Sequence, residues 1–295
     1  MNNVKRNGKG KIFLALISLY FIWGSTYLAI RLALEGFPPF MLAGVRFLFT
    51  GGGTYLFLRA RGRPVPHRRE WIGASVVGGL LLLGGNGGVV YAEQYVSSGL
   101  AALGVAAVPL WTVLFSGIWK RWPNSLEWAG ISVGFAGVGL LNLESGMRAG
   151  PEGAMALLAA SVCWAFGSAW SRQLSMPKGL MSAAVQMLSG GMLLLTASLL
   201  SGESIKVMPG SKALGALLYL MLFGSLVAFS AYVYLLEKVR PALATSYAYV
   251  NPAVAVTLGI LFAGEKITGT GIAAMAIISA GVVLVALGQK STRID

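Results

Sequence analysis

Long apolar stretches separated by short polar connections run through the whole chain. Ten of them are long enough to cross the hydrocarbon core of a bilayer, which takes about 20 helical residues. They have no strand-like alternation, and a strand of a membrane barrel needs only about 10 residues. We therefore predict an all-α integral membrane protein without a soluble domain. The predicted helices are 12–33, 38–58, 71–95, 98–118, 126–143, 153–172, 180–200, 212–236, 242–262 and 268–287.

The distribution of Lys and Arg predicts how these helices cross the membrane. Cytoplasmic loops are enriched in these residues, and most of the 23 fall on one side if the N-terminus is inside. The other side then receives only Arg31, Arg148, Lys206, Lys212 and Lys266. We predict that both termini are cytoplasmic. The net charge of +13 is thus a topology signal, and we expect no nucleic-acid partner. The first apolar run lacks a small-residue cleavage site, so we interpret it as a retained transmembrane helix.

The second half of the chain repeats the first. A shift of 143 positions lays Val96 on Val239 and Pro109 on Pro252. A shift of 141 lays Trp23 on Trp164, and one of 140 lays Arg46 on Gln186. We predict two five-helix repeats, 11–143 and 152–288. Because five is odd, the second repeat enters the membrane from the opposite side, which is the inverted arrangement of many secondary transporters.

Pro109 and Pro252 lie near the middle of the two matched apolar runs at 98–118 and 242–262. A proline inside a helix removes one N–H and frees a carbonyl four residues earlier. In lipid, a freed carbonyl must be satisfied by protein or by water in a cavity. We therefore expect both helices to be broken there, and assign both prolines a gating or structural role.

Composition agrees with a membrane protein and excludes several activities. The chain is 56% hydrophobic and only 11% charged, whereas soluble domains average about 25% charged residues. Its one cysteine, Cys163, forms no disulfide within the chain, and its one histidine, His67, lies in a basic loop. We expect no enzymatic activity, no metal and no cofactor.

Arg46 is the most informative single residue, since it lies about eight residues, or roughly 12 Å, into its helix. A charge at the centre of a membrane helix costs at least about 2.5 kcal/mol, so we expect it to face the protein interior. It either contacts a substrate carboxylate or has a structural role, for example by pairing with Glu93. Glu93, near the outer end of the third helix, is either a gate or proton carrier, or a residue solvated at the membrane interface.

Aromatic and amide side chains are the remaining candidates for a binding site. Mid-helix Trp and Tyr can stack on flat substrates or recognise cations, although core packing explains them equally well. Asn86 lies among four glycines, and Asn251 precedes Pro252 one turn after Tyr247. The candidates for substrate binding are Trp23, Tyr27, Arg46, Asn86, Tyr91, Trp111, Trp164, Tyr247 and Asn251.

Four segments resemble the EamA family, a branch of the drug/metabolite transporter superfamily. They are Trp23-Gly24-Ser25-Thr26-Tyr27, Val45-Arg46-Phe47, the run from Ala244 to Pro252, and Gly264-Glu265. The resemblance covers about residues 10 to 288. It implies an exporter in the cell inner membrane that works by alternating access around a central cavity.

We accordingly expect a transporter that exports amino acids, aromatic ones included, or similar small metabolites across the lipid bilayer as a monomer. The alternative within transport is efflux of lipophilic cations. Such a site needs a buried carboxylate, and the first helix has none between Lys11 and Leu34. A membrane enzyme and a purely structural protein are further alternatives; the first lacks a catalytic set, and matched repeats argue against the second.

Overall fold

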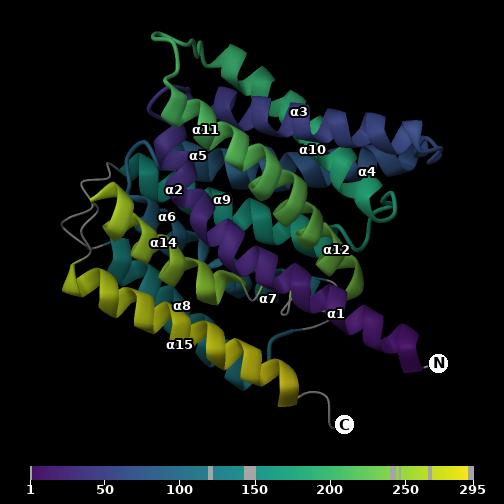
Figure 1. Cartoon of the computed structure of the whole chain (residues 1–295). Helices are drawn as coiled ribbons and strands as arrows, with labels where there is room; N and C mark the ends of the chain where they lie inside the picture. Colours follow the sequence, from purple (N-terminus) through teal and green to yellow (C-terminus); the bar gives the residue numbers. More distant parts are fainter. Residues whose placement is uncertain are drawn as a thin grey trace.

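The computed structural model describes residues 2–118, 122–142, 151–239, 244–245, 247–264 and 268–291, and every regular element in these residues is a helix (Figure 1). The first half contains α1 (Asn2–Ser18), η1 (Leu19–Trp23), α2 (Gly24–Ala33), α3 (Pro39–Ala60), α4 (Arg68–Gly78), η2 (Gly79–Gly87), α5 (Gly88–Ala92), α6 (Ser98–Val105), α7 (Val108–Ile118) and α8 (Ser125–Asn142). The second half contains α9 (Pro151–Trp170), α10 (Leu180–Leu200), α11 (Ser211–Tyr219), η3 (Leu220–Phe229), α12 (Ser230–Lys238), α14 (Tyr247–Ala263) and α15 (Gly269–Ser291).

Seven helical stretches in the described residues are long and apolar enough to cross a membrane. They are Gly10–Ala33, Pro39–Ala60, Arg68–Ala92, Ser98–Phe115, Pro151–Trp170, Leu180–Leu200 and Ser211–Lys238. Val250–Phe262 and Gly269–Gly281 are shorter apolar helices. The prediction of an all-helical membrane protein is therefore confirmed, while the count of ten spans stays a prediction.

Three π-helical segments, η1, η2 and η3, interrupt the first, third and eighth apolar runs. Two of them are related by the repeat, since a shift of 143 lays 79–87 on 222–230, within and next to η3. A π-helical turn holds an extra residue and changes the direction in which the following side chains point, and such turns are frequent at functional sites. The sequence pattern predicted ordinary helices at these positions.

The two matched prolines behave differently. The helix is interrupted as predicted at residues 106–107, between α6 and α7 and just before Pro109, but Pro252 lies inside the continuous helix α14. The expectation of a break at Pro252 is therefore wrong. The amide NH₂ of the neighbouring Asn251 donates to the carbonyl of Tyr247 (3.2 Å). It also donates to the carbonyls of Leu19 and Tyr20, which ties α14 to η1. Residues 240–243, Ser246 and Glu265 lie outside the described residues.

Helices α3 and α10 cross at glycines that are related by the repeat. A Cβ on Gly51 would lie 2.5 Å from the backbone N of Leu188, and one on Gly191 would lie 2.4 Å from the backbone N of Leu48. A shift of 140 converts the first contact into the second. Reciprocal contacts of this kind are the signature of a two-fold interface, and only glycine permits the two backbones to approach so closely.

Helices α8 and α15 pack in the same reciprocal way. A Cβ on Gly137 would lie 2.8 Å from the backbone N of Ile278, and one on Gly281 would lie 2.5 Å from that of Gly134. A shift of 144 relates these two contacts. Figure 1 shows this pair on the opposite side of the bundle from α3 and α10, and shows α1 beginning at the same end at which α15 ends. Between the two pairs lies a core of helices from both halves.

Candidate functional site

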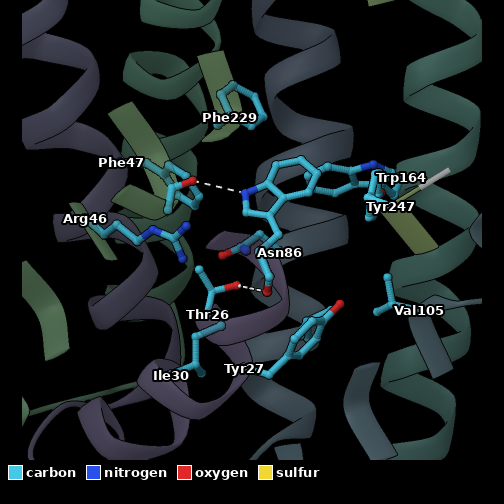
Figure 2. A pocket seen from close by; sticks show the side chains of 13 residues that line it. Thr26, Tyr27, Ile30, Arg46, Phe47, Asn86, Val105, Trp164, Phe229 and Tyr247 are labelled. Atoms are coloured by element: carbon cyan, nitrogen blue, oxygen red, sulfur yellow. Dashed lines mark hydrogen bonds between the residues drawn. The ribbon is translucent and has the colours of Figure 1, made fainter. Parts of the chain in front are cut away.

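A small cavity of about 50 Å³ lies in this core, where helices of both halves meet (Figure 2). Most of its wall is aromatic or aliphatic, with a single charged side chain among the residues that line it. These are Trp23, Thr26, Tyr27, Ile30, Arg46, Phe47, Asn86, Val89, Val105, Trp164, Gly224, Phe229 and Tyr247. The volume is enough for a few water molecules.

Arg46 on α3 is 98% buried and points into this cavity (Figure 2). Its Nε donates to Ser225 Oγ at 2.6 Å, and its Cζ lies 4.6 Å from the centre of the Phe47 ring. The bond to Ser225 leaves the terminal nitrogens of the guanidinium for a ligand. The alternative pairing of Arg46 with Glu93 is not found among the salt bridges of the described residues.

Gly224, the residue before Ser225, has no side chain and so leaves space for the guanidinium of Arg46. A Cβ at this position would lie 2.8 Å from Arg46 Nη2 and 3.0 Å from Thr26 Cγ2. The carbonyl oxygen of Gly224 accepts a hydrogen bond from Trp23 Nε1 at 3.1 Å. The π-helical segment η3 thus positions both the arginine and the tryptophan of the cavity.

Three aromatic side chains on one side of the cavity, Trp23, Trp164 and Tyr247, pack against Tyr232 behind them, and we call these four residues the aromatic cluster. The Trp23 ring packs edge-on against Trp164 (5.4 Å between centroids) and Tyr247 (4.9 Å). Trp164 Nε1 donates to the Tyr232 hydroxyl at 3.1 Å. Each member comes from a different helical stretch, so relative motion of the helices must break these contacts.

Asn86 enters the cavity from η2 and faces the same space as Arg46 (Figure 2). Its Oδ1 is buried and accepts no hydrogen bond from any described residue. A buried carbonyl without a donor is costly, and such groups are expected to find a partner in water or a ligand. Asn86 and Arg46 therefore offer an acceptor and several donors to one occupant.

The structure brings together six of the nine predicted binding residues. Trp23, Tyr27, Arg46, Asn86, Trp164 and Tyr247 line the cavity. Sequence reasoning missed the roles of Gly224 and Ser225, which position Arg46. No sequence signal identifies them, because glycine and serine are common throughout these helices.

The other three predicted residues lie elsewhere. Tyr91 stacks on Phe40 (5.8 Å) and lines a separate hollow at one end of the bundle. Trp111 packs edge-on against Phe135 (4.7 Å) in a cluster around α7. Asn251 is 98% buried, and its amide NH₂ donates to carbonyl groups of α14 and η1. These contacts are structural in this conformation.

Glu93 is completely buried at the end of α5, so its interpretation as a solvated interfacial residue is wrong. Its backbone carbonyl accepts a hydrogen bond from Arg31 Nη1 at 2.8 Å. The repeat mate of Arg31, Arg172, donates to the carbonyl of Leu236 at 3.1 Å, and a shift of 143 lays Glu93 on Leu236. Each half therefore has an arginine that ties its first helix to the end of its third.

Two further hollows open at opposite ends of the bundle. One, of about 530 Å³, lies among the residues before α3, the end of α5 and the loop after α10. The other, of about 840 Å³, lies among the loop after α9, the start of α10 and the end of α12. The repeat relates part of the two linings, since a shift of 141 lays Gly36 on Pro177 and one of 143 lays Gln94 on Glu237.

Membrane-length helices of two related halves surround a cavity that one buried arginine lines. These features define an integral membrane protein of the transporter class. The sequence profile of the EamA-like transporter family matches residues 10–143 and again 151–287. The chain therefore belongs to the EamA-like transporter family, which also bears out the prediction that it is not an enzyme.

Known proteins agree with this assignment. The chain is 46% identical over 279 residues to the uncharacterized inner membrane transporter YedA of Escherichia coli (strain K12), covering 94% of this chain and 91% of YedA. It is 26% identical to Protein PecM of Dickeya dadantii (strain 3937), over 90% of this chain and 88% of PecM. A solved crystal structure at 22% identity matches with a TM-score of 0.70 over 94% of this chain and 97% of that chain. The protein is an inner-membrane transporter.

Proposed function

We propose that this transporter exports amino acids, aromatic ones included, or similar small metabolites from the cytoplasm by alternating access. The observation that carries the proposal is the setting of Arg46. Its guanidinium is buried and faces a cavity that is lined by Trp and Tyr side chains. Ser225 binds only the Nε of this guanidinium, so the two terminal nitrogens can bind a substrate. A guanidinium pairs favourably with a carboxylate, and aromatic walls suit a flat or apolar side chain.

The proposed topology has ten spans in two inverted repeats, 11–143 and 152–288, with both termini cytoplasmic. The reciprocal contacts of Gly51 with Leu188 and of Gly191 with Leu48 support a two-fold relation between the halves. The Lys and Arg distribution supports the orientation. In such an arrangement the binding site lies between the repeats near the membrane midplane.

The volume of the cavity supports an alternating mechanism. Pockets that hold drug-sized ligands measure about 300–1,000 Å³, far more than the 50 Å³ found. We interpret the structure as a contracted state that opens when the two halves rock against each other. In this mechanism, Arg31 keeps the outer end of the helix bundle closed and Arg172 keeps the inner end closed. The segments that move include Glu93, Pro109 and Pro252.

Efflux of lipophilic cations is the second candidate. Aromatic side chains attract cations, and the aromatic cluster contains four aromatic side chains. Among the residues that line the cavity, however, the one charged side chain is Arg46, and it would repel a cation. The proposal therefore favours a substrate with a carboxylate. We expect a monomer to suffice, because one chain supplies the whole wall of the cavity.

The test is transport by purified protein in liposomes, with a panel of labelled amino acids and with tetraphenylphosphonium as the lipophilic cation. Each is measured with and without a pH gradient, which also reveals proton coupling. We expect uptake of at least one amino acid above that of protein-free liposomes. Transport of the cation together with none of the amino acids would instead establish the second candidate.

A further inference from the structure

The hollow of about 840 Å³ at the inner end of the bundle has the features of a second binding site. It opens where α9 and α12 end and α10 begins. In the proposed topology this end faces the cytoplasm. Val233 of α12 lines the hollow, while its neighbour Tyr232 belongs to the aromatic cluster on one side of the central cavity. A solute in this hollow is thus separated from the central cavity by one helix and the aromatic cluster.

Gln186 lies in the wall of this hollow and is 98% buried. Its Nε2 donates to Ser182 Oγ at 3.0 Å, but its buried Oε1 accepts no hydrogen bond from any described residue. Buried amide oxygens nearly always have a donor, so this oxygen indicates a missing N–H or O–H group. Gln186 is also the repeat mate of Arg46, the residue that faces the central cavity.

The charges around the hollow complement the amide. Lys178 and Lys238 both line it, are exposed, and form no salt bridge with any described residue. Arg172 is held by backbone carbonyls, and Glu237 Oε1 accepts from the Gly179 N–H at 2.9 Å. The ammonium groups of Lys178 and Lys238 can therefore bind an anionic group of a solute, and Gln186 Oε1 can accept a hydrogen bond from that solute.

We propose that this hollow is a cytoplasmic loading site for small zwitterions. Lys178 and Lys238 hold the carboxylate, and Gln186 Oε1 accepts a hydrogen bond from the ammonium group. The site collects the substrate before the aromatic cluster opens toward Arg46. This inference rests on the proposed function, because it assumes an amino-acid substrate and the N-inside topology.

The experiment compares transport from the two faces of the membrane. Initial uptake rates of the amino acid found in the liposome panel are measured in inside-out and in right-side-out membrane vesicles. The variants are Gln186→Leu and the double variant Lys178→Ala/Lys238→Ala. The matched control is Lys206→Ala/Lys212→Ala, which removes two lysines from the opposite end of the bundle. The double variants change only exposed lysines, so they still test the site if Gln186→Leu fails to insert.

We expect both inner variants to raise KM at the cytoplasmic face by about tenfold, which is the effect of one lost hydrogen bond to a charged group. KM at the outer face and the maximal rate should stay within about twofold, as in the control. An unchanged cytoplasmic KM in variants that still transport would overturn the loading site and leave the proposed function standing. An equal rise at both faces would also overturn it, because it would place the effect at the central cavity. Absence of amino-acid transport by the unmodified protein would overturn the proposed function itself.

Discussion

Replacing Gly224 by alanine is a specific way to disturb the proposed substrate site without removing any of its polar groups. The added Cβ would lie 2.8 Å from Arg46 Nη2, where an ordinary contact is at least 3.4 Å. The guanidinium must therefore withdraw by about 0.6 Å (3.4 − 2.8 Å). Because Thr26 Cγ2 would also be crowded, at 3.0 Å, the backbone of η3 has little freedom to shift instead.

The size of the effect follows from what holds the arginine. Its Nε is bonded to Ser225 at 2.6 Å, and its guanidinium lies over the Phe47 ring, so withdrawal strains both contacts. Inserting a methyl group into a packed interior costs about 1–3 kcal/mol. If this cost falls on the substrate complex, affinity decreases by roughly 5-fold to 150-fold.

The assay is concentration-dependent uptake into proteoliposomes that contain Gly224→Ala protein. The matched control is Gly215→Ala in α11, part of the same helical stretch, where a Cβ has no neighbour within 4 Å. We expect KM to rise at least about fivefold for Gly224→Ala and to stay unchanged for the control. Equal KM values for the two variants would refute the conclusion that Gly224 sets the position of Arg46.

Two further predictions concern packing and gating. Gly51→Ala should lower the stability of the detergent-solubilised protein by about 1–3 kcal/mol or more, because the added Cβ would lie 2.5 Å from a backbone N. The control Gly53→Ala should not lower it, because a Cβ there has no neighbour within 4 Å. Thermal unfolding measures the stability of both variants, and equal losses would contradict the close helix crossing. Arg31→Ala should favour opening of the helix bundle at its outer end, and Arg172→Ala should favour opening at its inner end. Maleimide labelling of single cysteines introduced at each end measures the opening. If both variants opened the same end, the paired role of the two arginines would be contradicted.

The sequence was sufficient to predict the helical membrane architecture. A bilayer requires backbone hydrogen bonds to be satisfied within each helix, so the presence of membrane-spanning helices follows from the length and hydropathy of the apolar runs. The π-helical segments were not predicted, because one extra residue in a turn leaves composition and hydropathy unchanged. The continuity of α14 through Pro252 was missed because the surrounding helices decide whether a proline inside a membrane helix is tolerated, and the sequence pattern does not show those helices.

The position of a side chain was predictable where the cost of burial constrains it. Arg46 had to face the interior, and it does; Trp23 and Trp164, equivalent in the two repeats, meet in the aromatic cluster. Asn251 and Trp111 are also buried, but burial alone does not distinguish a side chain that faces a cavity from one that packs between helices. Their contacts are decided by tertiary packing, which the sequence pattern does not contain.

In the proposed mechanism, Arg46 contacts the carboxylate of the exported amino acid. The most direct measurement is transport of the amino acid identified in the liposome panel by Arg46→Ala protein, with Lys212→Ala as the control and membrane insertion verified for both. We expect Arg46→Ala to abolish transport and the control to retain it. Normal transport by well-folded Arg46→Ala protein would show that Arg46 does not hold the substrate.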